Sequence, residues 1–212
     1  MATSTATRPH FKAEAALHTL HALTGDEYDE MVRDGALGEE DKVELLEGYV
    51  VFKMAINPPH DNAVAVLIEV LVRMNLPGWM VRSQGTAKLT ESRPEPDVAL
   101  ARGDRRTFAN RHPEPADFGL VVEVSEPSLA RDEQDKTRIY ARDLIPVYWV
   151  VNLVDRRVEV FTDPTGPDPA AGSPGGDEPH YRARQDYPAG TAVPVVLDGT
   201  TVGTVAVDEL LP

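Results

Sequence analysis

Apolar side chains recur at spacings of three and four along residues 61–75, which is the pattern of one buried helix face. The apolar positions are Val64, Leu67, Ile68, Leu71 and Met74. A second, highly charged helix is expected over residues 129–143, with Ile139 and Tyr140 on its inner side. A shorter helix should begin at Thr24, which stands three residues before Glu27 as in a capping box, and run to about Arg33.

Other segments have the alternating or continuous apolar patterns of strands. Residues 118–124 are apolar apart from Gly119 and Glu123, which predicts a strand buried on both faces. Two short strands are expected around a turn at Glu47-Gly48. Further strands are expected over residues 79–82, 86–89, 97–101, 147–153, 156–161, 180–187 and 192–197. The order of these elements predicts an α/β or α+β fold with a central mixed sheet flanked by helices and extra strands near the C-terminus.

The length of 212 residues fits one domain, expected over residues 23–212. Residues 1–22 are expected to form a flexible lead, since they lack the apolar stretch of a signal peptide, and residues 163–179 a flexible loop rich in Pro and Gly. The chain has no cysteine, which excludes disulfides, zinc–thiolate sites and cysteine nucleophiles and agrees with a cytoplasmic location. No apolar run is long enough to cross a bilayer, so no membrane association is expected.

Three ionisable residues have positions that indicate a shared site. Glu123 is a lone carboxylate in an apolar strand, where burial is costly unless the group is paired or binds a metal. Asp97 follows Pro96 and begins another strand. Lys136 lies on the charged helix after Glu123 and shares a helix face with Tyr140, four residues on. We expect Asp97 and Glu123 on adjacent strands, with Lys136 pointing into the same cleft.

Each of these residues also has a plainer explanation. Glu123 could reach solvent or an arginine at a strand end, and Asp97 could be an ordinary turn residue. Lys136 could belong to a solvated helix face, which is the usual place of a lysine in a charged helix. The hypothesis of a site therefore depends on the combination of the three residues.

The order of several motifs resembles the Uma2-like family, also called domain of unknown function 820, within the PD-(D/E)XK nuclease superfamily. The resemblance covers about residues 43–161, more than half of the chain. Its motifs are Glu44-Leu45-Leu46-Glu47-Gly48, Asn57-Pro58-Pro59-His60, Glu95-Pro96-Asp97-Val98, Leu120-Val121-Val122-Glu123-Val124-Ser125, Asp135-Lys136 with Tyr140, and Pro146-Val147-Tyr148-Trp149-Val150-Val151. It implies a restriction-endonuclease-like core.

The resemblance also implies a metal site. Asp97 and Glu123 would hold Mg²⁺, or Mn²⁺ in its place, because hard cations take oxygen ligands. Glu44 would add a third carboxylate. Glu47 is its rival, and Glu44 is preferred because it takes the family's glutamate position. His60 is a possible auxiliary residue that orients a phosphate or a water, although a histidine at the start of a helix more often binds no ligand.

The lysine departs from the superfamily pattern. The usual third element is Glu-X-Lys, and here Ser125 stands where that lysine would be. Lys136, on the following helix, is the matching catalytic candidate. A lysine beside the attacking water would orient it and stabilise developing charge.

Two functions of different classes follow. The first is a Mg²⁺-dependent endonuclease that hydrolyses phosphodiester bonds in DNA, with DNA as substrate and a homodimer as the expected assembly. The second is a binding or assembly protein that keeps the nuclease fold without the chemistry. The fold alone does not decide between these two functions. A buried carboxylate pair has few structural roles, which favours the endonuclease.

The formal charge of −14 opposes binding of nucleic acid. A local basic strip would offset it, and carboxylates of a metal site contribute to the negative count. The candidates for such a strip flank the expected strand at Asp97, and they are Arg82, Lys88, Arg93, Arg102, Arg105 and Arg106.

Overall fold

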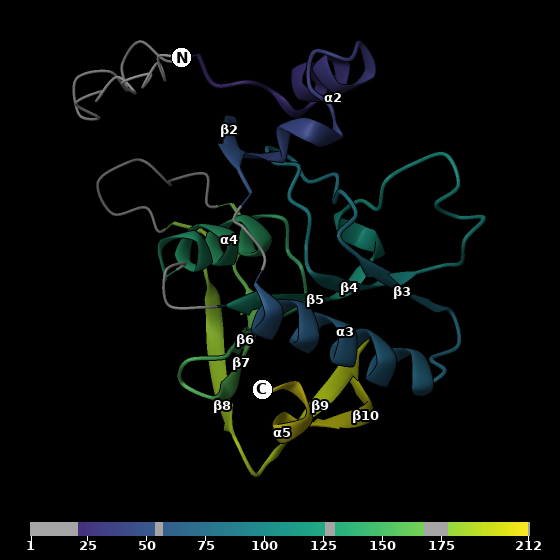
Figure 1. The fold of residues 1–212 in the computed structure, drawn as a ribbon, viewed down its shortest axis with the longest axis vertical. Coiled ribbons are helices and arrows are strands. Elements are labelled where there is room, and N and C mark those ends of the chain that lie inside the picture. Colours follow the sequence, from purple (N-terminus) through teal and green to yellow (C-terminus); the bar gives the residue numbers. More distant parts are fainter. Residues whose placement is uncertain (1–20, 54–56, 126–129, 168–177, 212) are drawn as a thin grey trace, which may run out of the picture.

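A six-stranded sheet forms the centre of the computed structural model, which describes residues 21–53, 57–125, 130–167 and 178–211 (Figure 1). Its strands, in spatial order, are β3 (Trp79–Ser83), β4 (Val98–Arg102), β5 (Phe118–Ser125), β6 (Val147–Asn152), β7 (Arg157–Pro164) and β8 (Tyr181–Pro188). Only β5 and β6 pair in parallel, and every other neighbouring pair is antiparallel. The expected central mixed sheet is therefore confirmed. The expected flexible lead lies almost wholly outside the described residues, as do residues 168–177 of the expected loop.

The helix α3 (Pro58–Arg73) packs on one face of this sheet. It begins three residues earlier than its apolar pattern indicates, because the Asn57 side chain caps it by accepting from the His60 amide at 3.1 Å. Pro58 and Pro59 fit its first turn, where no amide hydrogen is required. The same core contains side chains from the C-terminal elements β9 (Ala192–Leu197), β10 (Thr200–Ala206) and α5 (Val207–Leu210). Strands β9 and β10 form their own hairpin, outside the central sheet.

The helix α4 (Ala130–Arg142) packs on the opposite face, where Ile139 and Tyr140 are buried. Strand β5 is buried along its whole length, as its continuous apolar pattern predicts. Its side chains alternate between the two cores, so that Val122 lies with α3 and Val121 with α4. Two-sided burial of β5 holds every one of its side chains in a defined direction.

A smaller unit lies beside the sheet and comprises α2 (Gly25–Arg33), β1 (Val43–Leu46) and β2 (Tyr49–Phe52) (Figure 1). Helix α2 begins with the expected capping box between Thr24 and Glu27. Arg93 attaches this unit to the sheet: its amide donates to the Leu45 carbonyl at 2.7 Å and its guanidinium to Asp29 at 2.9 Å. The Arg93 side chain is only 3% exposed, so Arg93 is a structural anchor. The prediction that Arg93 belongs to a basic surface strip is therefore wrong.

The expected strand over residues 86–89 is also wrong. This segment is irregular, although Ala87 and Leu89 are buried. The Ala87 amide donates to the Pro94 carbonyl and the Lys88 amide to the Pro113 carbonyl, both at 2.8 Å. The alternating apolar pattern is produced by a loop that packs inward, and prolines opposite it have no amide hydrogen to complete a ladder.

Short 3₁₀ turns complete the described elements, at Glu39–Asp41 and Pro115–Asp117. Within the described segments, no helix has the length and apolar character needed to span a membrane.

Candidate active site

Two adjacent strands bring Asp97 and Glu123 together. Asp97 directly precedes β4, and Glu123 lies near the end of β5. Val98 is opposite Val122 in the antiparallel pair, and one further step of this register sets Asp97 opposite Glu123. The Val124 amide donates to Asp97 Oδ2 at 2.8 Å, which fixes the aspartate against β5. Glu123 points to the α4 face because it is two residues from Val121.

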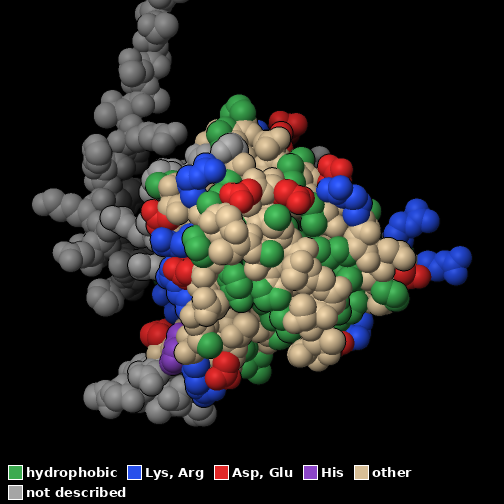
Figure 2. Space-filling view, turned by 90° about the horizontal axis from the view of Figure 1, so that it is seen from below, with side chains coloured by type: hydrophobic (Ala, Val, Ile, Leu, Met, Phe, Trp, Pro, Cys, Tyr) green, Lys and Arg blue, Asp and Glu red, His purple; other side chains and the backbone are tan. Residues whose placement is uncertain are grey.

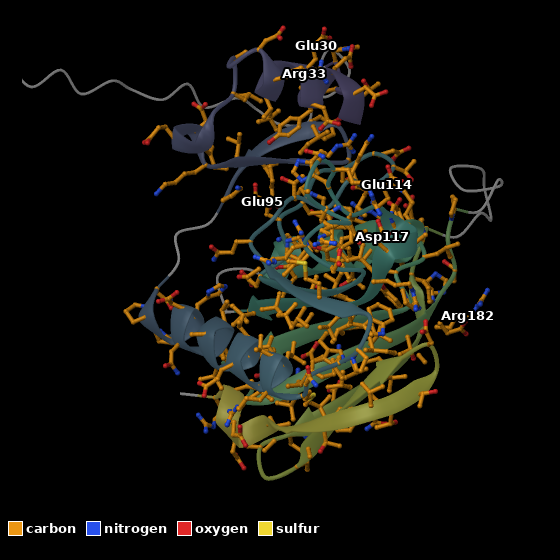
Figure 3. All side chains as sticks on the ribbon, turned by 90° about the vertical axis from the view of Figure 1, so that its right-hand side faces the viewer. Glu30, Arg33, Glu95, Glu114, Asp117 and Arg182 are labelled. Carbon is orange, nitrogen blue, oxygen red and sulfur yellow. The ribbon has the colours of Figure 1, made fainter. Side chains whose placement is uncertain are left out.

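The first hairpin supplies a third carboxylate. Glu44 on β1 is only 7% exposed, and its Oε2 accepts from the Glu95 amide at 3.2 Å. Glu95 lies between this hairpin and the sheet, where its own carboxylate pairs with Lys53 at 2.5 Å (Figure 3). Glu44 therefore reaches the α4 face of the sheet from a segment more than fifty residues before Asp97.

Glu47, the rival of Glu44, is engaged elsewhere. It forms ion pairs with two arginines of α4, with Arg142 at 2.8 Å and with Arg138. Burial by itself would raise the pKa of Glu47, but these two guanidiniums outweigh burial and lower that pKa below its ordinary value. The geometry thus groups Glu44, rather than Glu47, with Glu123.

Helix α4 directs a lysine and a tyrosine at Glu123. Lys136 Nζ lies 3.1 Å from Glu123 Oε1 and 3.7 Å from Glu44 Oε1. Four residues later, the Tyr140 hydroxyl donates to the same Glu123 oxygen at 2.7 Å. The spacing of one helical turn points both side chains toward the sheet, so Lys136 is not part of a solvated helix face. The Tyr140 hydrogen bond was not foreseen from the sequence, where the residue was expected only to pack inward.

His60, in the first turn of α3, reaches the cluster from the other side of the sheet. Its Nε2 lies 3.1 Å from Asp97 Oδ2, and both side chains are largely buried. The capped start of α3 brings His60 to the same end of β4 as Asp97. His60 therefore contacts a cluster carboxylate, which makes it more than a residue that begins a helix.

The electrostatics of the cluster are dominated by its excess of carboxylates over cations. Burial raises the pKa of Glu123 to about 7, with Asp97 and Glu44 adding to the increase, while Lys136 and Tyr140 oppose it. Burial alone would lower the pKa of Lys136, but Glu123 and Glu44 outweigh it and raise that pKa above its ordinary value. The lysine is thus charged at neutral pH, and Glu123 titrates near neutrality.

The donor set fits a hard divalent cation in its chemistry. Asp97, Glu123 and Glu44 offer oxygen ligands, and their combined charge exceeds that of Lys136. Across the described ranges, however, no group of three or more His, Cys, Asp or Glu side chains has the arrangement of a preformed metal site. Lys136 Nζ contacts both Glu44 and Glu123 and supplies positive charge between these two carboxylates.

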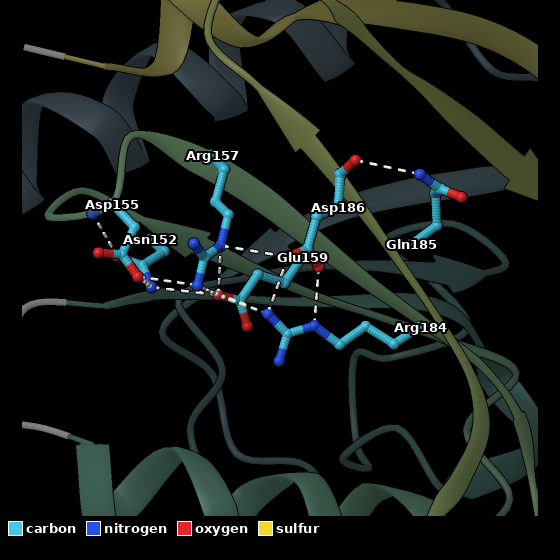
Figure 4. A network of polar contacts seen from close by, with 7 residues as sticks. All are labelled: Asn152, Asp155, Arg157, Glu159, Arg184, Gln185 and Asp186. Carbon is cyan, nitrogen blue, oxygen red and sulfur yellow. Dashed lines mark hydrogen bonds and ion pairs between the residues drawn. The ribbon is translucent and has the colours of Figure 1, made fainter.

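A second buried carboxylate on the same face shows the difference between this cluster and a structural ion-pair network. Glu159 on β7 lies two strands from Glu123, since Val150 is opposite both. Its Oε1 is surrounded by Arg157 at 2.8 Å, Arg184 at 3.1 Å and the Asn152 amide at 3.2 Å (Figure 4). Glu159 has abundant positive partners, whereas Glu123 shares one ammonium with Glu44.

The fold and the cluster define the class of protein. A mixed sheet in which adjacent strands present an aspartate and a glutamate to a lysine is the arrangement expected of a restriction-endonuclease-like fold. The structure is similar to the "Crystal structure of a putative nuclease belonging to DUF820 from Anabaena variabilis ATCC 29413", with a TM-score of 0.61. The match covers 89% of this chain and 97% of the other at 15% sequence identity, so it shows the shared fold.

The family follows from the sequence comparison. Residues 26–179 match the family model described as "Uma2: Putative restriction endonuclease". The chain belongs to the Uma2 family, since the match spans more than half of its length. No curated protein matches the chain.

Proposed function

We propose that this protein is a Mg²⁺-dependent endonuclease that hydrolyses phosphodiester bonds in DNA, with Mn²⁺ able to replace Mg²⁺. The observation that carries the proposal is the convergence of Glu44, Asp97, Glu123 and Lys136 from four separate segments of the chain. A buried set of carboxylates around one lysine is costly to assemble for stability alone. Its composition matches what phosphodiester hydrolysis requires.

Each residue has a role that its contacts support. Asp97 and Glu123, with Glu44, would hold the cation, and the cation would lower the pKa of a bound water and neutralise phosphate charge. Lys136 would orient the attacking water and stabilise negative charge that develops on the phosphate. His60 fixes the Asp97 carboxylate and Tyr140 fixes that of Glu123, so both act as positioning residues.

Plasmid nicking in Mg²⁺ or Mn²⁺ at low salt tests the proposal. Asp97→Asn and Glu123→Gln should abolish nicking, because each keeps the shape of the side chain and removes the charge that attracts the cation. Glu159→Gln is the matched control, since it changes a buried glutamate on the same face outside the cluster. Equal nicking by wild type and both site variants would place any chemistry elsewhere.

The alternative is a binding or assembly protein that has the fold without the activity. The formal charge of −14 favours it, as does the salt bridge that Lys136 forms with Glu123. Folded wild-type protein that cleaves neither DNA nor RNA in either metal would support this alternative.

We further propose a cytoplasmic homodimer, and sedimentation equilibrium would detect a mass of twice 23.2 kDa.

A further inference from the structure

The loop after β4 is a concentration of positive charge in an acidic protein. Residues 102–112, which are the last residue of β4 and the loop that follows it, contain four arginines and one acidic residue, a formal charge of +3 in a chain of −14. Figure 1 draws this loop at the right-hand edge of the molecule, and Figure 2 shows Lys and Arg side chains projecting from the same edge. Such a charge concentration is the electrostatic signature of an anion-binding surface.

Two of these four arginines already have acidic partners. Arg102 forms an ion pair with Asp198 at 2.5 Å and stacks over the Trp79 ring at 4.4 Å. Arg111 binds Asp117 through both guanidinium nitrogens, at 2.5 and 3.0 Å. Their charge is largely neutralised in place, so neither is a strong candidate for an external ligand.

Arg105 and Arg106 differ from these two. Both are exposed, and among the described residues neither side chain forms a hydrogen bond or an ion pair. The adjacent carboxylate of Asp104 is used by its own turn, where it accepts from the Arg106 amide, the Thr107 amide and the Thr107 hydroxyl. The turn therefore presents two guanidiniums to solvent.

Arg82 connects the loop to the face that carries the candidate active site. Its guanidinium lies 5.1 Å from the centre of the Phe108 ring, and that of Arg111 lies 5.0 Å from the same ring. Arg82 is opposite Ala99 on β4, and Ala99 is opposite Val121 on β5, so Arg82 is on the face of Glu123. Two strand spacings and two residues along the strand separate their Cα atoms by roughly 12 Å.

The aromatic rings of this region do not offer bases a place to stack. Guanidiniums cover Phe108 and Trp79, and Phe108 also packs against the α4-side core. Proteins that bind single strands combine positive charge with free aromatic faces. Positive charge without a free ring instead fits the phosphate backbone of a duplex, which offers regularly spaced anions and requires no base contact.

We propose that Arg82 on β3, together with Arg105 and Arg106 in the loop after β4, binds the phosphate backbone of duplex DNA beyond the phosphate that is cleaved. The proposal deepens the nuclease function and rests on it. Binding through phosphates is independent of sequence. It also explains how a chain of −14 holds a polyanion, because Arg82 lies on the face of Glu123 at roughly 12 Å, a distance comparable to the width of the DNA major groove.

The test measures binding without cleavage. Fluorescence anisotropy of a labelled 20-base-pair duplex is recorded against salt, in EDTA, with Glu123→Gln protein. Adding Arg105→Ala and Arg106→Ala should weaken binding equally for duplexes of different sequence. It should also reduce the slope of log K against log salt by about 0.9 for each lost phosphate contact.

The control removes the same charge elsewhere. Arg33→Ala with Arg182→Ala changes two exposed arginines away from the β4 loop (Figure 3) and should leave the slope unchanged. Equal slopes for the loop variant, the control and the parent would overturn the proposal while leaving the nuclease function intact. A loss confined to a single-stranded oligonucleotide would overturn the duplex assignment. Absence of binding by the folded parent at low salt would also overturn this proposal, and plasmid nicking by the wild type would then show whether the proposed function fails with it.

Discussion

Glu123 is buried at 7% exposure beside two other carboxylates, and one ammonium and one phenol are its main partners. A carboxylate so placed is held by the rest of the fold against its own preference for water. The pKa of about 7 expresses this cost, because the folded protein favours the protonated form over a range in which the unfolded chain is ionised. A bound cation would remove the cost by supplying the missing charge.

The stability of metal-free protein should therefore depend on the protonation of Glu123. A carboxyl group with a raised folded pKa contributes stability below its ordinary pKa of 4.5, and this contribution is lost as the pH rises toward about 7. The loss is roughly 3 kcal/mol for a shift of this size. Urea unfolding in EDTA across this window should show it for wild type and not for Glu123→Gln. A constant difference between the two proteins at every pH would refute the expectation.

Replacement of Lys136 should impair nicking without impairing the binding of Mg²⁺. Lys136→Met preserves the length and packing of the side chain and removes the charge, so nicking should fall by about 10²-fold or more. Mg²⁺ binding, measured by calorimetry, should persist, because the lysine is a competing cation at Glu44 and Glu123. Lys53→Met, which removes a lysine paired with Glu95, serves as the control. Loss of Mg²⁺ binding together with activity would indicate a structural role instead.

At the scale of elements, Lys136 and Tyr140 lie four residues apart on α4, and both contact the Glu123 carboxylate. Tyr140→Phe removes the hydrogen bond to Glu123 and keeps the ring in its core. The variant should lose about 1–2 kcal/mol of unfolding free energy at pH 8, where Glu123 is ionised, and less at pH 5. The reason is that this hydrogen bond stabilises the charged form and lowers the pKa of Glu123. Equal losses at both pH values would show that the bond does not depend on the charge of Glu123.

The position of the first hairpin depends on Arg93. Its guanidinium bonds to Asp29, to the Leu89 carbonyl at 2.5 Å and to the Ser92 carbonyl at 2.9 Å, all with the side chain 3% exposed. Arg93→Ala should cost about 3–5 kcal/mol, since it leaves these groups without their donor. Because β1 carries Glu44, the variant should also lose nicking activity at temperatures where circular dichroism shows the sheet intact. Full activity in such a protein would show that Glu44 does not need this anchor.

At the scale of the whole molecule, the proposed nuclease function requires an acidic chain of formal charge −14 to bind a polyanion through a restricted surface. Nicking by wild-type protein should fall steeply between about 50 and 200 mM salt, because counterion release supplies most of the binding free energy. The measurement is the initial nicking rate at fixed Mg²⁺ and varied NaCl. A rate independent of salt would contradict backbone recognition and would require contacts of another kind.

Local patterns in the sequence determined most of the elements and part of the site. The helical spacing of Val64, Leu67 and Leu71 and the continuous apolar run of β5 record burial directly, so α3 and β5 are found where expected. The four-residue spacing of Lys136 and Tyr140 likewise fixed their common direction, since it depends only on helix geometry. The family motifs added the identity of the carboxylates to consider.

Only the tertiary structure decided which of these groups meet. Glu44 and Glu47 stand three residues apart in one hairpin. Glu47 is bound by Arg138 and Arg142, from a helix about ninety residues later, and Glu44 is left to join the cluster. The burial of Arg93 and the irregular course of residues 86–89 likewise depend on partners distant in the chain. Periodicity reports whether a side chain is buried, because burial repeats with the local geometry of the backbone. It does not report the partner of a buried charge, since that partner is chosen by the packing of elements whose contacts leave no regular trace in the sequence.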